Sequence, residues 1–126
     1  MNSVLHIDTA DIHGQTSALR VAGDMDLATV SVLELTVDEV LSDHRTVILD
    51  LTGVTFCDSS GLNTLIRLRR RAQDTGGRLI LAAPPPQMMR LLTITGTGSV
   101  FAIYGSLAEA WQAHPPPGPP GAPPTA

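Results

Sequence analysis

Residues 47–62 read VILDLTGVTFCDSSGL, and this stretch decides the fold. Its first five residues are apolar apart from Asp50, which is typical of an internal strand buried on both faces of a parallel sheet. A turn at Gly53 is expected next, followed by Asp-Ser-Ser-Gly at 58–61 and a helical pattern rich in arginine. The stretch therefore predicts a buried strand that leads to an exposed helix N-terminus carrying two serine hydroxyls.

The place of Ser59 in this pattern suits phosphorylation better than catalysis. A helix N-terminus presents unpaired N–H groups and favours negative charge. A phosphate there adds about −1.5 to −2 charges at pH 7 and three acceptor oxygens, and the neighbouring Asp58 would repel it. Ser59 and Ser60 also fit a role as helix-capping residues. The residues alone leave that alternative open.

Strand and helix patterns alternate along the rest of the chain. Strands are predicted over residues 4–8, 16–23, 46–51, 78–82 and 100–104, and helices over 28–41, 59–75, 86–95 and 106–113. Gly14 marks the turn between the first two strands, Asp26 is a capping candidate for the first helix, and Gly76-Gly77 ends the second. This order predicts an α/β fold: a mixed, mostly parallel sheet of four to five strands with an antiparallel N-terminal pair and about four helices packed on it.

The length of 126 residues allows one domain with one core, which we expect over residues 1–113. Aromatic residues make up only 3% of the chain, so this core must be built from aliphatic side chains. Residues 114–126 hold seven of the ten prolines and show no apolar periodicity. That segment is predicted to be a disordered, proline-rich tail.

The composition argues against several classes of protein. The net charge is −4 and all eight basic residues are arginine, so no general attraction to nucleic acid is expected. The single Cys57 excludes an internal disulfide and a cysteine-based zinc site, and its apolar context indicates an inert buried thiol. No metal site or cofactor motif stands out. Because no signal peptide or membrane span is evident, we expect a cytoplasmic protein.

Several stretches, taken in order, resemble STAS domains of the anti-sigma factor antagonist type. They are residues 23–26 (GDMD), 47–51 (VILDL), 54–62 (VTFCDSSGL), 76–79 (GGRL) and 89–92 (MRLL). The resemblance covers roughly residues 4–112. It implies a partner-switching protein whose unphosphorylated form binds an anti-sigma factor and so frees a sigma factor. It also implies that the anti-sigma factor is a serine kinase of the GHKL type that phosphorylates Ser59, and that a PP2C-type phosphatase reverses this.

The same resemblance implies a surface for the partner. Its residues would be Asp24, Asp26, Asp58, Ser59, Ser60, Gly61, Leu62, Asn63 and Arg67. Two departures from the family pattern bear on the partner's identity: Asp24 stands where glutamate is frequent, and three prolines at 84–86 stand where one is usual. The arginines at 67 and 69–71 fit either a solvated helix face or pairing with acidic residues of a partner.

Two other functions compete with this hypothesis. An enzyme is disfavoured because residues 56–61 (FCDSSG) lack the first glycine of a G-x-S-x-G elbow, and because Gly96-Thr97-Gly98 lacks the lysine of a phosphate-binding loop. The alternative within the family is an adaptor subunit of a lipid-transporting ABC complex or a signalling scaffold. The intact Asp-Ser-Ser-Gly motif favours the phosphorylation switch.

Overall fold

The computed structural model describes residues 3–114, which form one α/β domain. Its elements are β1 (Leu5–His13), β2 (Thr16–Met25), α1 (Val30–Asp43), β3 (Thr46–Cys57), α2 (Ser59–Asp74), β4 (Arg78–Ala82), α3 (Pro86–Ile94), β5 (Ala102–Tyr104) and α4 (Leu107–Ala113). The order agrees with the one predicted from the sequence. The proline-rich segment from 115 to 126 lies outside the described residues.

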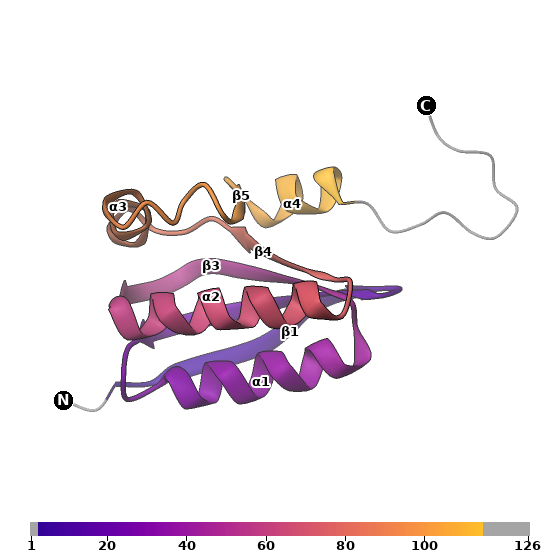
Figure 1. Ribbon diagram of the computed structural model, residues 1–126, viewed down its shortest axis with the longest axis horizontal. Coiled ribbons are helices and arrows are strands. Elements are labelled where there is room, and N and C mark those ends of the chain that lie inside the picture. The colour runs from indigo at the N-terminus through magenta and orange to yellow at the C-terminus, as the bar shows by residue number, and fades with distance from the viewer. Residues whose placement is uncertain (1–2, 115–126) are drawn as a thin grey trace, which may run out of the picture.

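The strands form a single sheet in the order β1-β2-β3-β4-β5 (Figure 1). β1 pairs with β2 in antiparallel fashion through a hairpin at Gly14, whose φ of 59° a glycine adopts without strain. The other three pairs are parallel. The mixed, mostly parallel sheet with four helices is therefore confirmed.

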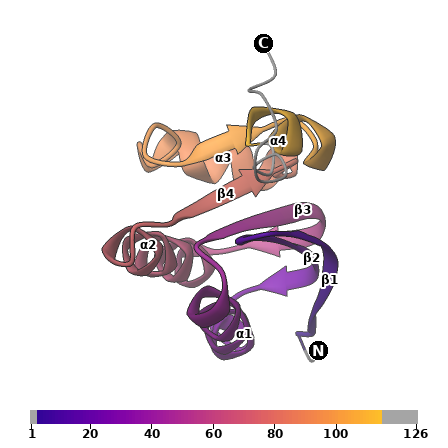
Figure 2. The same cartoon turned by 90° about the vertical axis from the view of Figure 1, so that its right-hand side faces the viewer.

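β3 lies at the centre of the sheet and is buried on both faces, as its composition predicts. Val47, Leu49 and Leu51 belong to the larger core with the buried side chains of α1, α2 and α3, whereas Ile48 belongs to a smaller core under α4. Figure 2 shows α1 and α2 side by side on one face of the sheet and α4 on the other. Both cores are mainly aliphatic, and Phe101 is the buried phenylalanine of the larger one.

β3 is longer than predicted, and the turn expected at Gly53 is wrong. The strand continues to Cys57 because β2 extends to Met25 and keeps pairing with it, with register shifts on either side of the Ala22–Gly53 pair. Such shifts are bulges, which bend a strand without ending it. A Cβ on Gly53 would lie 2.9 Å from the Ala22 Cβ, so the glycine serves this close approach instead of a turn.

α2 ends as the two glycines predict. Gly76 has a φ of 78°, and the Gly77 N–H donates to the carbonyl of Ala72 at 2.8 Å, which closes the last turn. At the other end of the described chain, the ring of His114 forms a 2.9 Å hydrogen bond with the Tyr104 hydroxyl. The composition places His114 at the start of the tail, but in the structure its side chain contacts the domain at Tyr104.

Candidate functional site

The carboxyl ends of β2 and β3 are tied together, which brings two predicted loops to one end of the sheet. The Asp58 N–H donates to the Met25 carbonyl at 3.1 Å. The first turn of α2 lies so close to β2 that a Cβ on Gly61 would come within 2.5 Å of the same carbonyl oxygen. The segment from 24 to 26 and the motif at 58–61 therefore form one surface.

Asp58 is the N-cap of α2. Its backbone is extended, with φ −101° and ψ −174°, and its Oδ1 accepts a hydrogen bond from the Gly61 N–H at 3.0 Å. The capping role considered for Ser59 and Ser60 is therefore filled by the carboxylate. Ser59 is exposed as the first residue of the helix, and no hydrogen bond within residues 3–114 occupies its hydroxyl.

The neighbours of Ser59 in the motif differ in exposure. Ser60 is half-buried and Asn63 is exposed, so both border the surface around Ser59. Leu62 is only 3% exposed and packs in the larger core, and Gly61 is buried. These last two residues shape the surface from beneath and do not present side chains on it.

The carboxylates of Asp24, near the end of β2, and of Asp26, in the β2–α1 loop, are held in place by hydrogen bonds. Asp24 Oδ1 accepts from the Thr55 hydroxyl at 2.7 Å, which links the end of β2 to β3 through side chains. Asp26 Oδ1 accepts from the Ala28 N–H at 3.0 Å. The N-cap residue of α1 is Thr29, so Asp26 stabilises the turn before the helix and not its first N–H groups as predicted.

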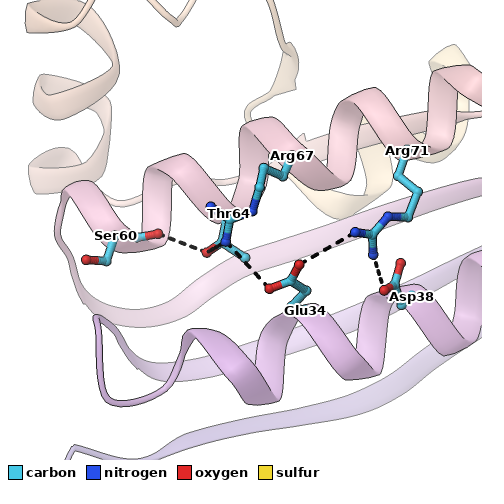
Figure 3. A network of polar contacts seen from close by, with 6 residues as sticks. All are labelled: Glu34, Asp38, Ser60, Thr64, Arg67 and Arg71. Carbon is cyan, nitrogen blue, oxygen red and sulfur yellow. Dashed lines mark hydrogen bonds and ion pairs between the residues drawn. The ribbon is translucent and has the colours of Figure 1, made fainter.

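Arg67 is exposed but is already paired within the domain (Figure 3). Its guanidinium lies 3.5 Å from Glu34 of α1 and donates to the Thr64 hydroxyl at 3.2 Å, and that hydroxyl donates to the Ser60 carbonyl. Arg71, one turn later, contacts Glu34 as well as Asp38, whose hydrogen bond raises the pKa of the Arg71 guanidinium. Exposed pairs of this kind add little stability, but they neutralise part of the arginine cluster.

Cys57 ends β3 two residues before Ser59, and its thiol is buried as predicted. Burial, with a smaller contribution from the Asp58 carboxylate, raises the pKa of the thiol to about 12. Because the thiolate is the reactive form, we expect the folded protein to react with iodoacetamide at pH 8 roughly a thousandfold more slowly than an unfolded thiol. Mass spectrometry before and after urea denaturation measures this, and rapid alkylation of the folded protein would contradict it.

Sequence reasoning missed Thr55 and Gln87. Thr55 holds Asp24 across two strands, and the Gln87 side chain of α3 bonds to both backbone groups of Cys57. These contacts join residues 30 or more positions apart in the chain. No local pattern in the sequence marks either residue, so only the folded arrangement reveals them.

Residues 3–114 contain no cluster of three or more histidine, cysteine or acidic side chains that would hold a metal ion. Within the same residues, no helix has the length and apolarity needed to cross a bilayer. At this end of the sheet lie the Ser59 hydroxyl, three carboxylates and the N-terminus of α2.

Comparison with known proteins assigns the chain to a family. The STAS domain model matches residues 8–110. An anti-sigma F factor antagonist of Paenibacillus polymyxa is 25% identical over 100 residues, which cover 78% of this chain and 86% of the relative. The crystal structure of an anti-sigma factor antagonist from Mycobacterium paratuberculosis superimposes with a TM-score of 0.77 at 27% identity, covering 87% of this chain and 93% of that one.

A second solved structure shares the fold at lower identity. It is the Bacillus cell fate determinant SpoIIAA in the phosphorylated form, with a TM-score of 0.67 at 21% identity over 88% of this chain and 99% of that one. The family match spans nearly the same residues as the resemblance seen in the sequence. The chain belongs to the STAS domain family, and its relatives include proteins named anti-sigma factor antagonists.

Proposed function

We propose that this protein is an anti-sigma factor antagonist whose unphosphorylated form binds an anti-sigma factor and thereby releases a sigma factor. The names of its relatives support the general role. The observation that carries the proposal is the Ser59 hydroxyl, which is exposed at the start of α2 while Asp58 performs the capping. Because no hydrogen bond within residues 3–114 occupies this hydroxyl, it is accessible to a modifying enzyme.

In this proposal the anti-sigma factor is itself a serine kinase of the GHKL type. Ser59 Oγ forms a bond to the γ-phosphorus of ATP while the bond from that phosphorus to the β–γ bridging oxygen breaks. The products are phosphoserine and ADP, and the hydroxyl proton passes to a base of the kinase. A PP2C-type phosphatase hydrolyses the phosphoserine and restores the binding form. The exchange takes place in the cytoplasm, where ATP and sigma factors are present.

The charges around Ser59 explain how a phosphate would act as a switch. The N-terminus of α2 stabilises the added negative charge, so the fold is expected to survive phosphorylation. A partner seated on the same surface already faces the carboxylates of Asp24, Asp26 and Asp58. The phosphate adds about two further negative charges. Removing them from water in the interface without a matching cation would weaken the complex with the partner. A protein of the same fold has been solved in a phosphorylated form, which supports the expectation that this fold tolerates a phosphate.

The test is a pull-down of tagged protein from its native cell with phosphosite mapping. Wild-type protein is expected to carry phosphate on Ser59 and to recover a GHKL-type kinase in its unphosphorylated form. Ser59→Ala should lose the phosphate, and Ser60→Ala, which removes the neighbouring half-buried hydroxyl, should keep it. Recovery of an ATPase and a permease by all forms, with no phosphate on Ser59, would instead identify an adaptor subunit.

A further inference from the structure

Near its carboxyl end, β3 lacks a neighbouring strand on one side. β4 ends at Ala82, so from Leu51 to Cys57 the only strand paired with β3 in the described residues is β2. The Gln87 side chain of α3 fills the missing place at Cys57. Its Oε1 accepts from the Cys57 N–H at 2.9 Å, and its Nε2 donates to the Cys57 carbonyl at 2.7 Å. A primary amide offers the same donor and acceptor as a peptide group, so Gln87 completes the ladder.

The segment that carries Gln87 to Cys57 is itself restricted. Ala83 has a φ of 53°, a left-handed conformation that a residue with a Cβ rarely adopts, and its N–H donates to the Tyr104 carbonyl at 2.8 Å. The three prolines at 84–86 follow, each with a fixed φ. Strained backbone persists where the surrounding structure imposes it, and it concentrates near functional sites. The backbone of residues 83–86, which leads to Gln87, therefore has little conformational freedom.

We propose that Gln87 is a positioning residue for phosphoryl transfer to Ser59. The role rests on the proposed function. Cys57 precedes Ser59 by two residues, and its peptide groups are held by Gln87 on the side where β3 has no strand. Catalysis of phosphoryl transfer depends mainly on placing the attacking oxygen in line with the phosphorus. A hydroxyl whose preceding backbone is fixed in advance reaches that arrangement more often than one on a free strand end.

Steady-state phosphorylation with ATP and Mg²⁺, using the purified kinase recovered in the pull-down, tests this role. Gln87→Met removes both hydrogen bonds, and kcat is expected to fall about tenfold while KM changes less than about twofold, since docking surfaces are retained. Gln87→Glu keeps the size and the acceptor but has no donor for the Cys57 carbonyl, so its kcat should fall as well. Hydrogen exchange of the Cys57 amide should become faster in Gln87→Met, which removes its acceptor, but not in Gln87→Glu, which keeps it.

Two control variants separate positioning from general effects. Gln73→Met makes the same chemical change at an exposed site in the last turns of α2. Ile80→Val weakens the smaller core on the opposite face of the sheet. Both should retain the wild-type kcat. If the Gln87 variants have the wild-type kcat, or if Ile80→Val loses as much kcat as they do, the positioning role of Gln87 is wrong while the proposed function still stands. A wild-type protein that takes no phosphate on Ser59 would overturn the proposed function, and this role with it.

Discussion

Replacing Ser59 by aspartate is expected to weaken binding to the anti-sigma factor by about a hundredfold, which corresponds to about 2.7 kcal/mol. The new carboxylate would stand beside Asp58, at the end of the sheet where the segment with Asp24 and Asp26 is tied to β3. Removing an unpaired charge from water in an interface costs free energy, and no opposite charge is present to offset that cost. Isothermal titration calorimetry with the purified partner measures the change.

The expected loss concerns binding and not the fold. An acidic residue at the first position of a helix is favourable, so the free energy of unfolding should change by less than about 0.5 kcal/mol. Ser42→Asp provides a matched control, because Ser42 is exposed in the last turn of α1 at the far end of that helix. It should bind like the wild type. Equal affinities for Ser59→Asp and the wild type would show that charge at Ser59 does not control the interface.

Most of the fold could be predicted because its signals are local. The apolar run at Val47, the helical period after Ser59 and the glycines at 76–77 each act within a few residues. Patterns of this kind along the chain predict the order of the nine elements found in residues 3–114. The exposed position of Ser59 also follows from a local rule, since a carboxylate directly before a helix is a good cap.

The parts that could not be predicted depend on contacts between distant segments. β3 continues past Gly53 because it stays paired with β2 as far as Cys57, and no pattern within the sequence of β3 indicates that pairing. Arg67 fits either a partner contact or a solvated residue, and no pattern in the sequence indicates its ion pair with Glu34 on another helix. Gln87 carried no signal, because its role exists only where α3 meets the end of β3. The contacts that hold the candidate site in place therefore could not be predicted from the sequence.

Replacing Gly77 by alanine is expected to cost about 3 kcal/mol or more of the free energy of unfolding, at the upper end of what overpacking causes. A Cβ there would overlap the Arg45 carbonyl, an oxygen that also accepts from the Arg78 N–H at 3.1 Å and so cannot move without disturbing the start of β4. Gly76→Ala is the matched control, because its Cβ would meet nothing within 4 Å. Only the left-handed φ of 78° opposes this change, and it is expected to lower the free energy of unfolding by about 1–2 kcal/mol. Urea unfolding of both variants measures the difference, and equal losses would mean that the close approach at Gly77 relaxes freely.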